Sequence, residues 1–308
     1  MRAFIFPGQG SQNVGMGATL ADASRAAKDV FDEVDEALGQ NLFRLMRDGP
    51  DDELKLTANA QPAIMAHSIA VLRTMGVRLP EIASFVAGHS LGEYSALCAS
   101  GSFDLATTAK LLKHRGQAMQ QAVPVGEGAM AALLGADLAL AQKIAEAAAQ
   151  GEVCTVANDN DPSQVVISGA KAAIDRAIAI AKDMGAKRAV PLPVSAPFHC
   201  PLMQPAAEAM RDALSYVIVE QPAVPVFANV TAQPETDPDT IRNQLVEQVT
   251  GMVRWRESVA NMFDAGVHEF VEIGGKVLGS MVKRIVPDAQ ATSIVTIEDV
   301  EAAAKEIA

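Results

Sequence analysis

The stretch "VAGHSLGEYSAL", residues 86–97, places Ser90 between two glycines at the spacing G-x-S-x-G. A serine hydroxyl is a weak nucleophile at neutral pH until a neighbouring base takes its proton. Gly88 and Gly92 permit a sharp turn from a strand into a helix, which exposes the hydroxyl and directs helix N-terminal amides at a reacting carbonyl. The same pattern also occurs as a plain helix cap. The apolar strand pattern before Ser90 and the helical pattern after it favour a nucleophile.

A nucleophilic serine needs a base, and histidine is the usual one. The candidates are the five histidines of the chain, His67, His89, His114, His199 and His268. His89 adjoins Ser90, but successive side chains in a tight turn point apart. His199 lies in the turn-rich stretch "SAPFHCP", just after the expected insert, a placement that could bring it back beside Ser90. The other three histidines lie inside helical patterns or before a strand, where structural roles are expected.

Acyl transfer through a serine also needs two N–H donors for the developing oxyanion. The amide of Leu91, directly after the serine, is the expected first donor. The second is expected from the loop "FPGQGSQ", at the backbone of Gly8 to Gly10. A dinucleotide-binding interpretation of this loop fails, because Asn13 occupies the last glycine position of G-x-G-x-x-G.

Composition and charge narrow the function classes. The chain has 308 residues, of which 49% are hydrophobic, and a formal net charge of -12. Such a surface repels phosphate backbones, so no nucleic-acid partner is expected. No stretch approaches the roughly 18 uncharged apolar residues of a membrane span, so no membrane association is expected. Three scattered cysteines predict neither a disulfide framework nor a metal site, and with no signal-peptide pattern they indicate a cytoplasmic protein.

Hydrophobic periodicity predicts an α/β protein with an inserted subdomain. Residues 3–6 and 83–88 are expected strands, and residues 24–38, 56–76 and 93–101 are expected helices. From about residue 124 the pattern becomes βαββαβ, which is typical of ferredoxin-like units. The expected fold is a large α/β-hydrolase-like domain with a parallel sheet, over 1–123 and 196–308, interrupted by a small ferredoxin-like subdomain over 124–195. The elements expected in the insert are 129–135, 138–151, 152–160, 163–169, 170–185 and 186–194.

Several motifs together resemble one family along nearly the whole chain. They are "FPGQGSQ", "GHSLGEYSAL", "KLLKHRGQAM", "GEGAMAALLG", "QVVISG", "APFHCPLM" and a late "VRW", in this order. They are similar to the malonyl-CoA:acyl carrier protein transacylases of fatty-acid synthesis. The acyltransferase domains of polyketide synthases are close relatives.

The resemblance implies a role for five residues of the catalytic machinery. Ser90 matches the nucleophile that carries the malonyl group as an ester, and His199 matches the general base and acid. Gln9 and Leu91 match the two oxyanion-hole amides. Gln248 matches the residue whose backbone carbonyl orients the histidine in place of a triad carboxylate.

The resemblance also implies how the acyl group is selected. Arg115 matches the arginine that pairs with the free malonyl carboxylate; by periodicity alone it would be a solvated helix arginine. Phe198 resembles the malonyl-selective pattern, since its bulk would crowd an α-methyl branch. The chain departs from the family at Gly251-Met252, where Asn-Pro is usual, beside the loop that holds Gln248.

The implied reaction is a ping-pong exchange from malonyl-CoA to the phosphopantetheine thiol of acyl carrier protein. Coenzyme A and phosphopantetheine enter as substrates, so neither a metal nor a bound cofactor is expected, and a monomer is expected. Three alternatives stay open: an acyltransferase of a polyketide pathway, a serine thioesterase or other hydrolase, and a non-catalytic scaffold. A hydrolase of the α/β type would carry its histidine near the C-terminus, whereas more than a hundred residues follow His199.

Overall fold

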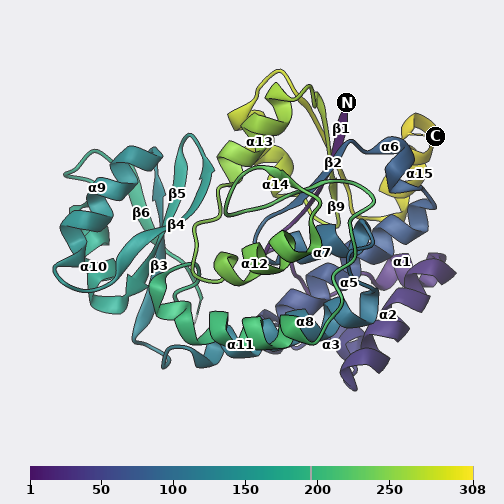
Figure 1. The fold of residues 1–308 in the computed structure, drawn as a ribbon, viewed down its shortest axis with the longest axis horizontal. Helices are drawn as coiled ribbons and strands as arrows, with labels where there is room; N and C mark the ends of the chain where they lie inside the picture. The colour runs from purple at the N-terminus through teal and green to yellow at the C-terminus, as the bar shows by residue number, and fades with distance from the viewer. Residues whose placement is uncertain (195, 308) are drawn as a thin grey trace.

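The computed structural model describes residues 1–194 and 196–307. Its larger sheet has six strands in the order β10-β9-β1-β2-β7-β8 (Figure 1). The first five strands run parallel, and β8 pairs antiparallel with β7 at the edge. This confirms the expected parallel α/β sheet. The strands are β1 (Arg2–Phe6), β2 (Phe85–Gly88), β7 (Val226–Phe227), β8 (Pro234–Glu235), β9 (Glu269–Ile273) and β10 (Gln290–Ile294).

Strand β1 shows why this sheet must be covered on both faces. Phe4 and Phe6 pack into the main apolar core, whereas Ala3 and Ile5 pack into a second core on the opposite face. A strand that is apolar on both sides is typical of parallel sheets, whose helices cover both faces. The second core contains Trp255, the single tryptophan of the chain, fully buried.

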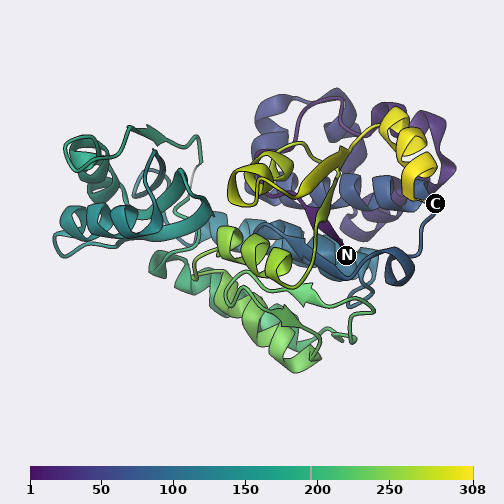
Figure 2. The ribbon, with the colours of Figure 1, turned by 90° about the horizontal axis from the view of Figure 1, so that it is seen from above.

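The helices of the large unit divide between these two cores (Figures 1 and 2). The second core lies under α13 (Trp255–Asp264) and α14 (Leu278–Ile285). Helices α5, α7 and α8 dominate the main core, with further helices packed around them. The helices of this larger group are α1 (Ala18–Ala23), α2 (Arg25–Leu38), α3 (Leu42–Asp48), α4 (Asp51–Lys55), α5 (Thr57–Met75), α6 (Leu79–Ile82), α7 (Leu91–Ala99), α8 (Leu105–Gln121), η1 (Pro201–Met203), α11 (Gln204–Ser215), α12 (Pro238–Gln248) and α15 (Ile297–Ile307).

A second, antiparallel sheet lies at one end of the molecule (Figure 2). Its order, β4-β5-β3-β6, is what two split βαβ units produce, so the ferredoxin-like pattern is confirmed. The sheet and its two helices enclose a separate apolar core. All its elements fall inside the predicted insert. They are β3 (Gly128–Leu134), α9 (Leu138–Ala149), β4 (Cys154–Asp161), β5 (Gln164–Ala170), α10 (Lys171–Ala181) and β6 (Arg188–Pro191).

The domain division at 123/124 and 195/196 stays a prediction. The residues 195 and 308, at the ends of the predicted segments, lie outside the described part of the chain. No helix in the described ranges combines the length and apolarity that a membrane crossing requires.

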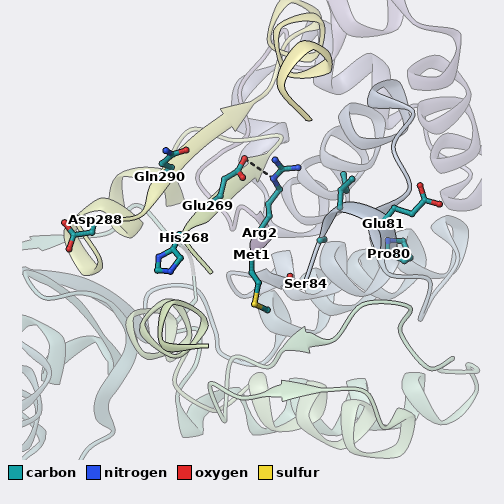
Figure 3. Close-up of a pocket in the computed structure, with 11 residues that line it drawn as sticks. Met1, Arg2, Pro80, Glu81, Ser84, His268, Glu269, Asp288 and Gln290 are labelled. Carbon is teal, nitrogen blue, oxygen red and sulfur yellow. Dashed lines mark ion pairs between the residues drawn. The ribbon is translucent and has the colours of Figure 1, made fainter. Parts of the chain in front are cut away.

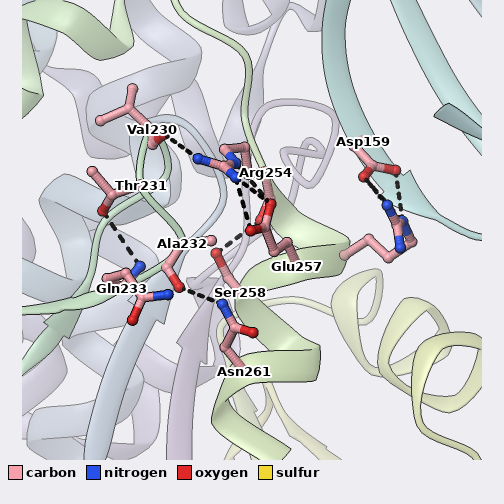
Figure 4. A network of polar contacts seen from close by, with 10 residues as sticks. Asp159, Val230, Thr231, Ala232, Gln233, Arg254, Glu257, Ser258 and Asn261 are labelled. Carbon is pink, nitrogen blue, oxygen red and sulfur yellow. Dashed lines mark hydrogen bonds and ion pairs between the residues drawn. The ribbon is translucent and has the colours of Figure 1, made fainter. Parts of the chain in front are cut away.

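Strand β4 joins the small sheet to the large unit. Val253 forms an isolated parallel bridge to it, donating its N–H to Ala157 O at 2.8 Å and accepting the Asp159 N–H at 3.0 Å. The buried Asp159 carboxylate also pairs with Arg256 of α13 at 2.8 Å (Figure 4). These contacts fix how the small sheet sits against the large unit.

The two ends of the parallel sheet differ in character. At the amino ends of the strands, a polar cavity of about 670 Å³ contains the Arg2–Glu269 ion pair, with N–O distance 2.9 Å, beside His268 and Asp288 (Figure 3). The carboxyl ends lead instead into the loops that carry Ser90 and Gln9. Ligands of parallel α/β sheets bind at the carboxyl ends, so the candidate site lies at that edge.

Replacing Arg256 with Met tests the joint between the sheets. The change leaves the Asp159 carboxylate, 1% exposed, without its partner. We expect the free energy of unfolding to fall by about 2 kcal/mol, less than for a fully buried pair because Arg256 is partly exposed. Urea denaturation followed by circular dichroism measures it.

Arg78→Met is the matched control, because the Arg78–Glu81 pair lies on the surface. Its loss should stay below about 0.5 kcal/mol. Equal losses in the two variants would contradict the role given to Asp159–Arg256.

Candidate active site

Ser90 occupies a strained turn between β2 and α7. Its backbone has φ 54° and ψ -111°, a conformation that residues other than glycine rarely adopt and that clusters at functional sites. The Ser90 N–H donates to Asn229 Oδ1 at 2.7 Å, and the Gly92 N–H donates to His89 O at 2.9 Å. The turn is therefore held by the side chain of the distant Asn229 and by a backbone hydrogen bond within the turn itself.

The glycines on either side of Ser90 are required by close backbone approach. A Cβ atom on Gly88 would lie 1.9 Å from the carbonyl carbon and oxygen of Gly92. A Cβ atom on Gly92 would lie 2.3 Å from Phe6 O, at the end of β1. The spacing G-x-S-x-G thus lets the strand, the turn and the helix pack at distances that any side chain would prevent.

The structure brings His199 to Ser90 from 109 positions away along the chain. The distance from Ser90 Oγ to His199 Nε2 is 2.7 Å, and that from His199 Nδ1 to Gln248 O is 2.8 Å. Because a carbonyl oxygen only accepts, Nδ1 carries the proton and Nε2 is free to accept the serine hydroxyl. His199 also has a positive φ, 56°.

Burial, reinforced by the nearby Arg115 guanidinium, lowers the pKa of His199 to about 3. The imidazole of the free protein is therefore neutral at physiological pH, the form that can take a proton from Ser90. The Gln248 carbonyl orients the ring without adding a negative charge.

Arg115 points inward from α8 and is only 1% exposed. Its Nη2 donates to Gln248 Oε1 at 2.8 Å and to Ser90 Oγ at 3.2 Å, and its Nη1 donates to Gln61 Oε1 at 2.8 Å. The guanidinium carbon lies 5.6 Å from the centroid of the Tyr94 ring. The interpretation of Arg115 as a solvated helix residue is therefore wrong.

These partners of Arg115 are all neutral. Among the described residues, no carboxylate forms an ion pair with the guanidinium, and its buried Nε has no hydrogen-bond partner. A buried cation held only by amides, a hydroxyl and an aromatic face is unusual, because buried charges normally pair with opposite ones. The arrangement is suited to an incoming anion.

A cavity of about 450 Å³ opens beside the serine and histidine. Gln9 lines it, and its side chain is held by a 3.1 Å hydrogen bond from Nε2 to Thr57 Oγ1. Met130 and Asn158 extend the wall from the small sheet, so both sheets contribute to the cavity. Gln248 contacts the site through its hydrogen bonds with Arg115 and His199. The predicted residues that line the cavity are Gln9, Ser90, Leu91, Arg115, Phe198 and His199.

Comparison with known proteins identifies the family of the chain. The sequence profile of the acyl transferase domain matches residues 3–293. The malonyl CoA-acyl carrier protein transacylase of Haemophilus influenzae is 46% identical over 294 residues, 95% of this chain and 94% of that protein. The chain belongs to the acyl transferase family.

Solved structures show the same kinship. An acyl-carrier-protein S-malonyltransferase from Bartonella henselae superimposes on this acyl transferase with a TM-score of 0.97, at 52% identity and with 99% of each chain covered. A malonyl-transacylase solved in complex with a type II PKS acyl-carrier protein gives a TM-score of 0.96 at 40% identity, covering 99% of each chain. The resemblance found in the sequence is confirmed.

Three polar residues of the acyl transferase site were missed by sequence reasoning: Gln61, Glu93 and Asn229. Asn229 follows β7, the neighbour of β2, and its Nδ2 donates to Gly88 O at 2.7 Å. A polar residue after a strand beside the strand that leads to Ser90 was the available signal, because the carboxyl ends of parallel strands meet at one edge. Gln61 and Glu93 carried no comparable signal.

The loop that carries Asn229 is anchored from α13 (Figure 4). Arg254 donates its backbone N–H to Asn229 O at 3.0 Å and its Nη1 to Val230 O at 3.2 Å. Asn261 Nδ2 donates to Ala232 O at 2.9 Å. This network keeps the Asn229 side chain against the turn that carries Ser90.

His67 and His89 have partners other than Ser90, as the sequence indicates. His89 Nε2 lies 2.8 Å from Asn160 Oδ1 of β4, so the ring next to Ser90 contacts the small sheet. His67 Nδ1 lies 3.2 Å from Gly274 O. In the described ranges, no three His, Cys, Asp or Glu side chains gather as a metal site.

Gly88→Ala tests the turn that presents Ser90. The added methyl collides with Gly92 backbone, so we expect acyl transfer to be abolished and the free energy of unfolding to fall by about 3 kcal/mol. Acyl-enzyme formation and urea denaturation measure the two effects.

Gly279→Ala is the control, because its nearest neighbours would lie at 3.6 Å or more and its φ is not in the left-handed region. It should change stability by less than about 1 kcal/mol and leave activity unchanged. An active Gly88→Ala enzyme would contradict the requirement for close backbone contact.

Proposed function

We propose that this acyl transferase moves the malonyl group from malonyl-CoA to the phosphopantetheine thiol of acyl carrier protein, supplying extender units for fatty-acid synthesis. The observation that carries the proposal is the buried Arg115 guanidinium, 3.2 Å from the Ser90 hydroxyl and held by neutral partners. A nucleophile beside an unpaired cation is suited to an acyl group that ends in a carboxylate.

The first half-reaction loads the serine. His199 Nε2 takes the Ser90 proton while Oγ attacks the thioester carbonyl carbon, and the electron pair of the C=O bond moves to its oxygen. The amides of Gln9 and Leu91 are the proposed donors to that oxyanion. Its collapse breaks the C–S bond, and the leaving sulfur of coenzyme A takes the proton from His199.

The second half-reaction reverses these steps with a different thiol. His199 deprotonates the phosphopantetheine thiol, its sulfur attacks the malonyl ester, and Ser90 Oγ leaves with the proton. His199, oriented by the neutral Gln248 carbonyl, acts as base and then as acid in each half-reaction, returning its proton to the coenzyme A sulfur in the first and to Ser90 Oγ in the second. Each proton taken is returned, and because coenzyme A and phosphopantetheine enter as substrates, the proposed exchange includes neither a metal nor a bound cofactor.

Arg115 is the proposed selector of the acyl group. A planar guanidinium can hold a carboxylate by two parallel hydrogen bonds, each worth roughly 1.5–3 kcal/mol. When a malonyl group enters, its carboxylate replaces amide partners of Arg115 such as Gln61. An acetyl group has no carboxylate to pair with the guanidinium. Phe198, on the cavity wall, is proposed to crowd an α-methyl branch.

The partners follow from the same chemistry. Malonyl-CoA and acyl carrier protein are the proposed substrates, and the relative solved with its carrier protein supports the second. The net charge of -12 supports the absence of nucleic-acid binding. We further propose a monomer that acts in the cytoplasm, where the three free cysteines Cys98, Cys154 and Cys200 would stay reduced.

Brief exposure to malonyl-CoA, followed by proteolysis and tandem mass spectrometry, tests the proposed function. We expect the malonyl group on Ser90, and transfer to carrier protein when it is added. The buried Ser95 on the same helix is an internal control that should stay unlabelled. An unlabelled Ser90 would overturn the mechanism, and release of malonate to water in preference to the carrier would favour the thioesterase alternative.

Arg115→Ala tests the proposed selectivity. Loss of two charge-assisted hydrogen bonds should lower kcat/KM for malonyl-CoA at least about a hundredfold, with acetyl-CoA retained or improved. Initial rates with both thioesters measure the ratio.

Lys113→Ala is the control on the same helix, since Lys113 donates to Gln40 and Asn59 outside the cavity. Its substrate ratio should be unchanged. Equal loss of malonyl and acetyl transfer in Arg115→Ala would mean that the arginine is structural.

A further inference from the structure

Glu93 is a buried carboxylate on the first turn of α7, 3% exposed. It stands three residues after Ser90, the spacing of a capping box, in which a glutamate reaches back to the N–H of the first residue. The structure shows a different arrangement. Asn229 Oδ1 takes the Ser90 N–H, and Glu93 accepts from the Asn229 N–H at 3.1 Å and from Gln248 Nε2 at 2.7 Å. Glu93 is therefore free for a role other than capping.

The contact with Glu93 determines which way the Gln248 amide faces. Gln248 Nε2 donates to Glu93 Oε2 and, at 3.0 Å, to Ser90 O, while Gln248 Oε1 accepts from Arg115 Nη2. A flipped amide would set oxygen against two acceptors and N–H against a donor. The carboxylate thus selects one orientation of the amide.

Gln248 links both halves of the site. Its backbone oxygen accepts from His199, and its side-chain oxygen holds Arg115. A single amide separates the Arg115 cation from the Glu93 carboxylate, so the two charges stabilise each other without a direct ion pair. An anion that binds Arg115 would therefore be repelled by the Glu93 carboxylate.

We propose that Glu93 is a positioning residue for acyl selection: its carboxylate orients the Gln248 amide and thereby aims Arg115 at the acyl tail, and its charge is coupled to that of the tail. This inference rests on the proposed malonyl transfer and deepens it. An acetyl tail, which carries no charge, should not sense the ionisation of Glu93.

The groups around Glu93 leave it as the one expected to titrate near neutrality. Burial raises the pKa of Glu93 to about 7. Burial likewise raises the pKa of Tyr94 to about 12, and it lowers those of His199, to about 3, and of His89. Arg115 keeps its positive charge in this range.

The sign of the coupling follows from linkage. A malonyl carboxylate near Arg115 repels the Glu93 carboxylate, so it favours the protonated form and takes up protons on binding. Malonyl binding should therefore weaken as pH rises through the pKa of Glu93. Acetyl-CoA shares the coenzyme A groups and the same base, so the malonyl-to-acetyl ratio isolates the effect.

The ratio of kcat/KM for malonyl-CoA to that for acetyl-CoA, measured from about pH 6 to about pH 8.5, tests the inference. In the unmodified enzyme we expect it to fall at least about threefold, carried by KM for malonyl-CoA. Glu93→Gln preserves the acceptor oxygen and removes the charge, so its ratio should be independent of pH. Glu93→Ala frees the Gln248 amide and should lower the ratio about tenfold at every pH.

Glu146→Gln, at an exposed position on α9, is the control and should match the unmodified enzyme. Thermal melts establish folding; if Glu93→Ala does not fold, the pH profile of Glu93→Gln decides. A Glu93→Gln enzyme that keeps the pH slope, or a folded Glu93→Ala enzyme with an unchanged ratio, would overturn the inference. An unmodified enzyme that forms no malonyl-Ser90 would instead overturn the proposed function.

Discussion

The 2.7 Å contact between Ser90 Oγ and His199 Nε2 is the interaction on which the site depends. Both residues have positive φ, a conformation that costs on the order of 1–3 kcal/mol and persists only where the surroundings enforce it. At Ser90, Asn229 and the glycine contacts supply that enforcement. At His199 the Gln248 carbonyl does so by accepting from Nδ1. The relative position of Ser90 and His199 thus depends on strained backbone conformations, which hydrogen bonds from distant segments stabilise.

The second constraint is electrostatic. A chain of net charge -12 buries the Arg115 cation beside the Ser90 hydroxyl and gives it amide oxygens, with the Glu93 carboxylate held one amide away. Direct pairing with Glu93 would neutralise the site before substrate arrived. Amide partners satisfy the N–H groups yet leave the charge available, so an anionic tail can gain more than a neutral one.

The shape of the cavity depends on how the two sheets meet. Met130 and Asn158 face the same space as Ser90 and Arg115, although they belong to the small sheet. Strand β4 is anchored through Val253 and through ion pairs from Arg256 and Arg284 to its buried aspartates, and this keeps that wall in place. The contact between His89 and Asn160 extends the anchoring to the residue beside Ser90. The contacts that stabilise the joint between the two sheets therefore also fix the positions of the residues that line the cavity.

Much of the fold was predictable from local pattern. Alternation and periodicity indicated the strand before Ser90, the helix after it and the βαββαβ insert, because all of these depend on neighbours along the chain. The short helices α1, α3, α4 and α6 were not anticipated, since four to seven residues carry too little periodicity. The strand order also depends on pairing between distant segments.

The features of the site likewise divide into those that local sequence indicates and those that depend on distant segments. The sequence by itself determined the glycine spacing at Ser90 and, through family resemblance, the identities of His199, Arg115 and Gln248. Only the tertiary structure decided that Arg115 points inward and that Glu93 orients an amide in place of capping its helix. Those outcomes rest on contacts across 133 and 155 positions of the chain. A side chain's burial and hydrogen-bond partners are set by whatever long-range packing brings to it, which no local pattern encodes.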